Sequence, residues 1–176
     1  MSADDAAATE GDQPTTEPLR EHGAVVTWSR GQKVLHAERA ALRSLVEALG
    51  RDGFDQLIDV TAVDYSAAHH ARTLPDGVAP ERYEVVVGLL SHARRERVRI
   101  RVQVPVGDPR VPSLFDLHPG SEALEREAFD MFGIVFDDHP DLSRILMPED
   151  WIGHPLRKDY AVGRIPVQFK GAPSSR

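Results

Sequence analysis

The 176-residue sequence contains no cysteine. The chain therefore has no means of forming a disulfide, a thiolate zinc site, a cysteine nucleophile or an ordinary iron–sulfur ligand set. Its apolar residues nowhere form an uninterrupted run of the ~18–20 residues that a membrane-spanning helix needs. The N-terminus also lacks a basic segment followed by an apolar one. These absences predict a cytoplasmic chain that is not itself inserted in a membrane.

The negative charge is concentrated at the N-terminus. The formal net charge is -7, and residues 1–18 hold Asp4, Asp5, Glu10, Asp12 and Glu17 with no basic residue. The remaining chain is nearly balanced and gives no electrostatic reason to expect a nucleic-acid partner. Residues 1–20 hold hardly any apolar side chains, which predicts a disordered acidic tail. The overall 41% of hydrophobic residues is enough to build the core of one domain.

Residues 21–133 have the periodicities of an α/β globular domain. Helical spacing of apolar residues predicts a helix within residues 35–49 that ends at Gly50. Alternation over residues 54–65 predicts a strand with one wet face. The side chains expected to face the core from this strand are Phe54, Ile58, Val60 and Ala62.

Two further strands are predicted downstream of a long loop, residues 66–82. The loop contains His69 and His70, for which plain exposure is a simpler interpretation than metal binding because no third ligand is apparent. Residues 83–90 are apolar on both faces and predict an interior strand. The next strand alternates core residues with Arg97, Arg99 and Arg101. This arginine face either binds an acidic partner or anionic lipid, or prevents wrong strand pairing, which we favour because the run is short.

A second helix is expected after Pro119, with Ser121 as its N-cap and Gly133 at its end. Arg126, Glu127 and Asp130 fill its polar arc, but Glu125 points into the apolar arc. An unpaired charge there would cost several kcal/mol, so we expect Glu125 to contact an arginine or backbone amides. A general-base role with a raised pKa is the alternative. The order of elements predicts an α+β, two-layer fold with helices packed on a mixed or antiparallel sheet.

Residues 134–176 have no sustained period, and prolines interrupt them repeatedly. They nevertheless carry many large apolar side chains, including Trp151 and Tyr160, which must be buried against something. We predict an extended C-terminal arm that folds back on its own sheet or binds a partner, with the partner favoured for its C-terminal half.

Several sequence words occur in one order in this part of the chain. They are Glu-Arg-Glu at 125–127, Asp-Met-Phe-Gly at 130–133, His-Pro-Asp-Leu at 139–142, Arg-Ile-Leu-Met-Pro-Glu-Asp-Trp at 144–151, and Gly-His-Pro-Leu-Arg-Lys-Asp-Tyr at 153–160. Together they resemble the C-subunit family of bacterial NADH-quinone oxidoreductase, respiratory complex I. Several long words in a fixed order are more specific than one short motif.

The resemblance implies a non-catalytic peripheral-arm subunit that scaffolds the quinone-site region during electron transfer from NADH to quinone. Its implied partners are the large D subunit and neighbouring iron–sulfur subunits, with membrane association only through the complex, on the cytoplasmic side of the cell membrane. It implies no cofactor or metal in this chain, since FMN and the iron–sulfur clusters belong to other subunits. The implied interface or signature residues are Glu125, Arg126, Glu127, Asp130, Met131, Phe132, Gly133, His139, Pro140, Arg144, Pro148, Trp151, His154, Pro155, Arg157, Lys158 and Tyr160.

Two other functions compete with this one. An energy-converting hydrogenase or a related quinone-reducing complex uses an equivalent subunit. A stand-alone metal-dependent hydrolase would use carboxylate and imidazole ligands to activate water. Its candidate ligands are Asp130, Asp138, His139, Asp141 and His154, but their spacing follows no familiar ligand pattern.

Overall fold

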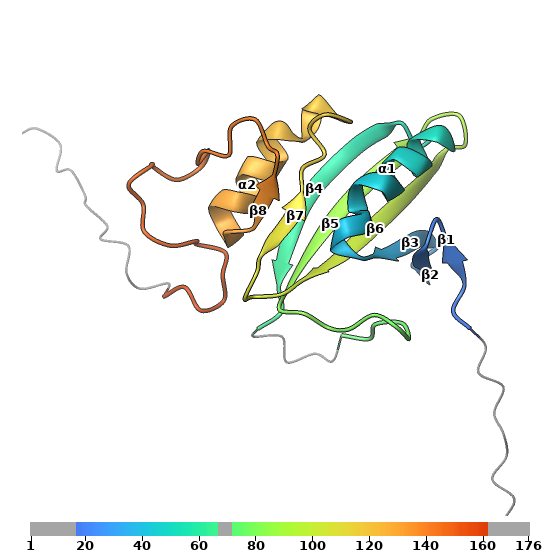
Figure 1. The fold of residues 1–176 in the computed structure, drawn as a ribbon, viewed down its shortest axis with the longest axis horizontal. Coiled ribbons are helices and arrows are strands. Elements are labelled where there is room, and N and C mark those ends of the chain that lie inside the picture. Colours follow the sequence, from blue (N-terminus) through green and yellow to red (C-terminus); the bar gives the residue numbers. More distant parts are fainter. Residues whose placement is uncertain (1–16, 67–71, 162–176) are drawn as a thin grey trace, which may run out of the picture.

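The computed structural model describes residues 17–66 and 72–161. Most of the expected acidic tail, the histidine pair in the long loop and the last fifteen residues of the arm lie outside these ranges. The described part is built on one mixed six-stranded sheet and a smaller two-stranded sheet (Figure 1). No helix within the described ranges is long and apolar enough to cross a membrane.

The large sheet has the strand order β1-β2-β3-β6-β5-β4, and all neighbours are antiparallel except β3 and β6. Its strands are β1 (Arg20–Glu21), β2 (Ala24–Ser29), β3 (Gln32–Ala37), β4 (Gln56–Asp64), β5 (Tyr83–Ser91) and β6 (Glu96–Val104). The second sheet pairs β7 (Arg110–Pro112) with β8 (Val135–Asp137) in parallel. The prediction that residues 83–90 form an interior strand is confirmed.

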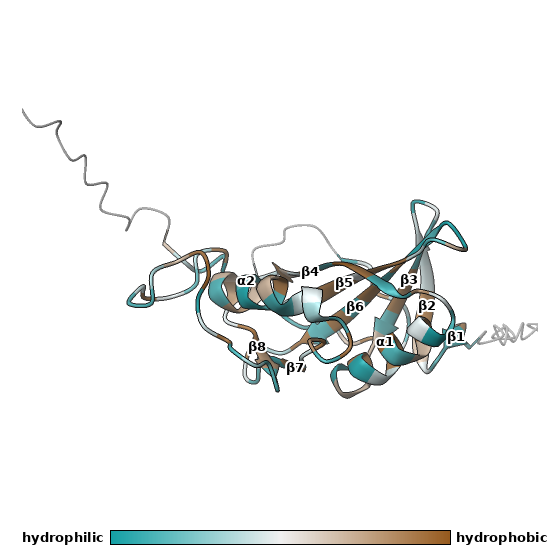
Figure 2. Ribbon diagram, turned by 90° about the horizontal axis from the view of Figure 1, so that it is seen from above, coloured by the Kyte–Doolittle hydropathy of each residue, from teal (hydrophilic) through white to brown (hydrophobic). Residues whose placement is uncertain are grey.

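Two α-helices complete the fold: α1 (Leu42–Arg51) and α2 (Glu122–Phe132). Each follows a short 3-10 turn, Arg39–Ala41 before α1 and Pro119–Ser121 before α2. Helix α1 lies across the sheet and α2 lies beside β4 (Figure 1). Apolar residues concentrate on the central strands (Figure 2), and alternate residues of β4, β5 and β6 join both helices in one core. The predicted two-layer α+β fold with a mixed sheet is confirmed.

The predicted first helix is present as α1; the structure gives its start, which the sequence left open, and moves its end. Leu35 belongs to β3, because the run before it pairs with β2 and β6 rather than continuing the helical period. The helix also does not end at Gly50. It continues to Arg51, and the chain reverses at Gly53, which has a φ of +93°.

The inward side of β4 was also predicted incorrectly at one residue. Val60 and Ala62 are buried as expected, but Ile58 is 42% exposed. An irregularity in the pairing with β5 lies between Leu57 and Asp59, and an extra residue there shifts the alternation of side chains by one.

Helix α2 ends where the sequence predicts it. Gly133 has a φ of +72°, the left-handed conformation of a C-terminal cap, and its amide donates to the carbonyl of Phe129 at 2.7 Å. The predicted N-cap is not formed, because the Ser121 side chain makes no capping hydrogen bond. Ile134 and Phe136 are core residues, so the globular domain extends to residue 137. We call residues 138–161 the C-terminal segment.

Replacing Gly133 with alanine should destabilise the fold more than the same change at another left-handed glycine. A Cβ at residue 133 would overlap the Arg157 guanidinium and lie 2.5 Å from Nε2 of His154. Gly31 has a similar φ of +77° but nothing within 4 Å of its added Cβ. In urea unfolding, Gly31→Ala should cost about 1–2 kcal/mol, the backbone penalty alone, and Gly133→Ala clearly more. Equal losses in the two variants would contradict this account.

Candidate functional site

Glu125, whose carboxylate points into the apolar arc of α2, is fully buried and has two hydrogen-bond partners. Glu125 accepts a hydrogen bond from the Leu114 amide at 2.8 Å and from Oγ of Ser113 at 2.6 Å. Ser113 is itself placed by its amide, which donates to the carbonyl of Asp137. The expectation that Glu125 contacts backbone amides is therefore confirmed. These bonds join α2 to the loop after β7, which is a structural use of the carboxylate.

The last four carbonyl groups of α2, those of residues 129–132, have no hydrogen-bond donor within the helix, as in every α-helix. The amide of Gly133 donates to the carbonyl of Phe129, and groups of the C-terminal segment bond to the other three carbonyls. Nδ1 of His154 lies 3.0 Å from the carbonyl of Asp130, and the Leu156 amide lies 3.0 Å from that of Met131. Nε of Arg157 donates to the carbonyl of Phe132 at 2.6 Å. The segment thus caps the helix residue by residue.

Asp130 fixes the same segment through its side chain. The fully buried carboxylate accepts hydrogen bonds from the successive amides of Ile145, Leu146 and Met147 at 2.8–3.1 Å. Nη1 of Arg144 donates to its other oxygen at 2.5 Å. Burial acts to raise the pKa of Asp130, but the amides and the guanidinium together hold this pKa below the ordinary value. A carboxylate on the polar arc of the helix therefore becomes an ionised anchor.

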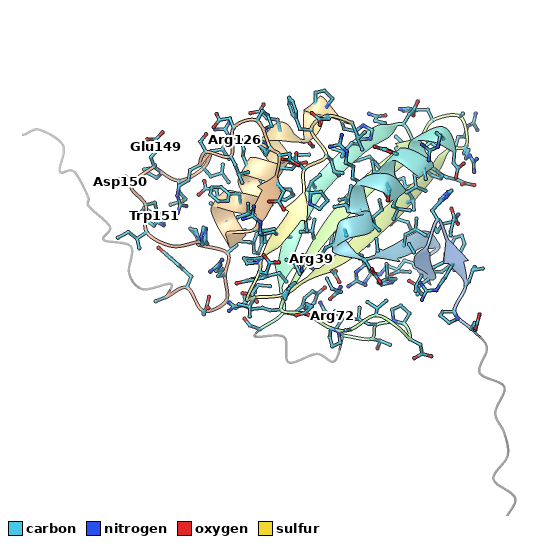
Figure 3. The ribbon with its side chains drawn as sticks, viewed as in Figure 1. Arg39, Arg72, Arg126, Glu149, Asp150 and Trp151 are labelled. Carbon is cyan, nitrogen blue, oxygen red and sulfur yellow. The ribbon has the colours of Figure 1, made fainter. Side chains whose placement is uncertain are left out.

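Two arginines complete these contacts between helix and segment. Arg126 donates to the carbonyls of Ser143 and Arg144 and to Oγ of Ser143, at 2.9–3.1 Å. It also pairs with Glu122 one turn earlier. Arg144 reaches the carbonyl of Gly153 at 3.0 Å and so ties the two ends of the segment's loop together. Arg126 lies between α2 and the segment in Figure 3.

A second buried carboxylate holds the segment at the end of the large sheet. Asp64, the last residue of β4, accepts from Arg82 at 2.9 Å and from the Lys158 amide at 2.9 Å. Arg82 also pairs with Asp159 at 2.9 Å. Burial raises the pKa of Asp64, yet its bonds to Arg82 and to the amides outweigh that effect and lower it strongly. The sequence around Asp64 and Arg82 contains no motif, so nothing in it predicts their role.

The side of β5 that faces away from the helices carries a further buried group. Glu84 accepts from Nε of Arg101 at 2.7 Å and from the side-chain Nε2 of Gln103 at 2.5 Å. His36 lies close to this pair, and burial followed by the nearby Arg101 lowers the pKa of its imidazole. Arg101 therefore stabilises the fold through an internal ion pair, which is neither of the two roles expected for the arginine strand. Its neighbours Arg97 and Arg99 are exposed.

The structure does not bring the five candidate ligands of a metal-dependent hydrolase together. Both carboxylate oxygens of Asp130 accept hydrogen bonds from residues 144–147, and Nδ1 of His154 bonds to the backbone carbonyl of Asp130. The imidazole of His139 uses Nε2 for the carbonyl of Glu122 and Nδ1 for the Asp141 amide. Across residues 17–66 and 72–161, one group of three such side chains has its ligand atoms within 4.8 Å of one another, and it lies elsewhere: Glu21, His22 and Asp52.

The remaining signature residues divide between the core and the surface. Met131 and Phe132 are buried in the core, and Trp151, Pro155 and Tyr160 are half-buried. Glu127, Pro140, Pro148 and Lys158 are exposed. Glu149, Asp150 and Trp151 form the outer turn of the C-terminal segment (Figure 3). Arg157, for which the resemblance implies contacts to a neighbour, has its Nε bonded inside the chain.

The C-terminal segment also carries a concentration of exposed apolar side chains. Of the large apolar residues that are exposed in the described chain, half fall within twelve positions: Ile145, Leu146, Ile152 and Leu156. Ile152 is 89% exposed. Nearby, Trp151, Ile152 and Tyr160 line an open pocket of about 750 Å³. We call these four residues, with Trp151 and Tyr160, the apolar surface.

A rigidly bonded segment that presents an apolar surface is typical of a protein that attaches to a larger assembly. Comparison with known proteins gives the particular family. Residues 35–165 match the model of a family described as respiratory-chain NADH dehydrogenase, 30 Kd subunit. The chain belongs to this family.

Curated relatives and solved structures agree with this membership. The chain is 42% identical over 163 residues to the C subunit of the NADH-quinone oxidoreductase of Saccharopolyspora erythraea, covering 88% of this chain and 61% of the relative. It is 43% identical over 146 residues to the protein of the same name from Acidothermus cellulolyticus, covering 81% and 71%. The chain thus spans about three fifths of the first of these relatives.

Two solved structures share the fold. A trypsin-resistant fragment of Nqo5 superposes with a TM-score of 0.60 and 33% identity, covering 68% of this chain and 90% of the fragment. A chain of the membrane-bound sulfane sulfur reductase, an archaeal respiratory membrane complex, also gives 0.60, but at 19% identity, with coverage of 87% and 90%. The second likeness shows the fold alone.

Substituting Asp130 with asparagine should release the C-terminal segment. The amide side chain would remove the charge opposite Arg144 and place a donor against three backbone donors. Breaking one partner of a buried ion pair costs about 3–5 kcal/mol. We expect urea unfolding to show a decrease of this size in the free energy of unfolding. Proteolysis within residues 144–157 should also become faster. The exposed Asp150→Asn is the matched control and should change neither measurement.

The His154 contact should make stability depend on pH. Burial lowers the pKa of His154 below its unfolded value of about 6.5, despite the raising effect of its bond to the Asp130 carbonyl. The unfolded chain therefore binds this proton first as the pH falls. The contribution of neutral His154 to the free energy of unfolding is complete above about pH 6.5. It decreases below that pH, by at most ~1.4 kcal/mol per pH unit.

Urea unfolding of native protein and of His154→Asn between about pH 7 and 5 measures this contribution. The variant should show a smaller slope of unfolding free energy against pH. Some slope should remain, because burial also lowers the pKa values of His36 and His118. Parallel curves for the two proteins would contradict the assignment to His154.

Proposed function

We propose that this chain is the C subunit of a proton-translocating NADH-quinone oxidoreductase and acts as a non-catalytic scaffold. Family membership and the shared name of the relatives support the complex. The observation that carries the scaffold role is the apolar surface on a segment already fixed by Asp130, Arg144 and Arg157. These buried charged groups bond to backbone and to one another, which supports a structural role for them.

In this proposal the chain lies in the peripheral arm, on the cytoplasmic side of the cell membrane, and reaches the membrane only through the complex. It carries no cofactor or metal; FMN and iron–sulfur clusters belong to other subunits. Its main partner is the large D subunit, which contributes to the quinone site, with iron–sulfur subunits nearby. The energy-converting hydrogenase and related complexes remain the second candidate. The curated relatives favour the NADH-quinone oxidoreductase.

The apolar surface is suited to burial by such a partner. Exposed side chains of Leu146, Ile152 and Leu156 gain about 25 cal/mol for each Å² removed from water. The indole Nε1 of Trp151 has no hydrogen-bond partner within the described residues, although a tryptophan N–H that is shielded from water usually finds one. Asp150 and Asp159 line the same pocket as Trp151, Ile152 and Tyr160 and give it a polar rim.

Point variants test this role better than truncation. Deleting residues 151–176 would also remove the caps on Asp130, Met131 and Phe132 and the bond to Asp64. The double variant Ile152→Ser/Leu156→Ser leaves those bonds in place. We expect it to fold with native stability yet to be recovered with the complex at least about tenfold less, since lost apolar contacts amount to more than 1.4 kcal/mol.

Recovery is measured by purifying the complex from membranes through one of its other subunits and quantifying this chain. Ile58→Ser, at an exposed apolar residue on β4, is the control and should co-purify normally. Normal recovery of Ile152→Ser/Leu156→Ser would refute the docking role of the apolar surface. Recovery with a hydrogenase rather than an NADH-oxidising complex would favour the second candidate.

A further inference from the structure

A second surface lies at the end of the large sheet opposite Asp64 and Lys158. Two hairpin turns meet there because the starts of β3 and β6 pair in parallel, with Lys33 beside Val98. The β2–β3 turn is Arg30–Gly31, and the β5–β6 turn covers residues 92–95. Residues from both turns line an open pocket of about 590 Å³. We call Arg30, Arg95, Arg97 and Arg99 of this lining the arginine pocket.

The four arginines are exposed and have no carboxylate within 4.0 Å among the described residues. Two other basic groups nearby are paired with carboxylates, whereas Arg94 of the β5–β6 turn lies over the Phe54 ring. Lys33 contacts Glu21 at 2.8 Å, and Arg101 contacts Glu84 at 2.7 Å. On the strand, the residues directly across from Arg97 and Arg99 are Leu90 and Gly88. The fold therefore pairs Lys33 and Arg101 with carboxylates but forms no ion pair with these four arginines, even though Glu96 also lines the pocket.

The backbone adds a second observation at two of the four positions. Arg30 and Arg95 have φ values of +51° and +56°, in the left-handed region. Glycine or asparagine suits such turn positions, and other residues cost about 1–2 kcal/mol there. Each hairpin thus holds an arginine at a position where the turn itself favours another residue. A role for the side chain explains that choice better than the backbone does.

We propose that the arginine pocket binds a carboxylate-rich segment of another protein. A guanidinium binds a carboxylate through two parallel hydrogen bonds, which a pocket between two rigid turns can orient. Trp28, 65% exposed, also lines the pocket and offers an aromatic contact. Outside residues 1–18 the chain is nearly balanced in charge, so it offers no general attraction to the extended negative charge of a membrane or nucleic acid, whereas a short acidic segment needs only the pocket. This surface is separate from the apolar surface and does not depend on its partner.

Zero-length crosslinking in intact membranes tests the proposal. A carbodiimide joins an amine to a carboxylate with loss of water, so it reports direct contact. We would introduce Arg97→Lys/Arg99→Lys into the full chain, which keeps the positive charges and adds amines. We expect an isopeptide bond from residue 97 or 99 to an Asp or Glu of another polypeptide, mapped by mass spectrometry. Its yield should fall several-fold when salt rises from about 0.1 M to 1 M.

The native chain and Arg51→Lys are the controls, since Arg51 is exposed but lies outside the pocket. Neither should give the new bond. A bond to the acidic residues 1–16 of the same chain would overturn the proposal, and so would the absence of any new bond. Flotation with phosphatidylglycerol vesicles provides the last comparison: binding by native protein that Arg97→Gln/Arg99→Gln abolishes would assign the pocket to a membrane instead.

Discussion

The C-terminal segment depends on one contact, which joins the end of α2, including the side chain of Asp130, to residues 144–157. A helix C-terminus carries partial negative charge and unpaired carbonyls, so a buried carboxylate in its last turn is doubly unfavourable. The fold compensates by placing donors at both groups. Three successive amides and the guanidinium of Arg144 donate to the carboxylate, and the imidazole of His154 bonds to the backbone carbonyl of Asp130. The segment that supplies them has no regular secondary structure of its own. Its shape is imposed by the helix end.

This arrangement explains how an irregular segment can present an ordered apolar surface. A free chain would lose about 1–2 kcal/mol of conformational entropy for each residue fixed on binding. Here that loss is offset within the domain, by the bonds to α2 and by Asp64 at the end of the sheet. Association with a partner then has fewer degrees of freedom to remove, which strengthens binding for the same buried area. The charged signature residues therefore hold the segment in place, and its apolar residues provide the surface that a partner can bury.

The sequence predicts what local periodicity determines. Helical spacing identifies α2, its end at Gly133 and the inward direction of Glu125, and the alternation over residues 97–102 gives the core face of β6. The same helical wheel places Asp130 on the polar arc, yet its side chain is fully buried. A wheel describes only the helix, whereas residues 144–147 cover that arc from fourteen positions away. The bulge that exposes Ile58 cannot be predicted from the sequence for the same reason, since the pairing of β4 with β5 determines it.

The arginine strand shows how one sequence pattern can have two outcomes. Arg97, Arg99 and Arg101 alternate regularly and are indistinguishable by period or charge. Arg101 meets a fully buried Glu84, for which an unpaired charge would be costly, so that guanidinium is part of the fold. The residues directly across β5 from Arg97, Arg99 and Arg101 are Leu90, Gly88 and Val86, and none of them is charged. Arg101 differs because Glu84, two positions before Val86 on β5, lies diagonally across from it. Whether an arginine stabilises the fold or remains available to a partner is thus decided by the neighbouring strand, because the pairing of the strands determines which side chains lie within reach of its guanidinium.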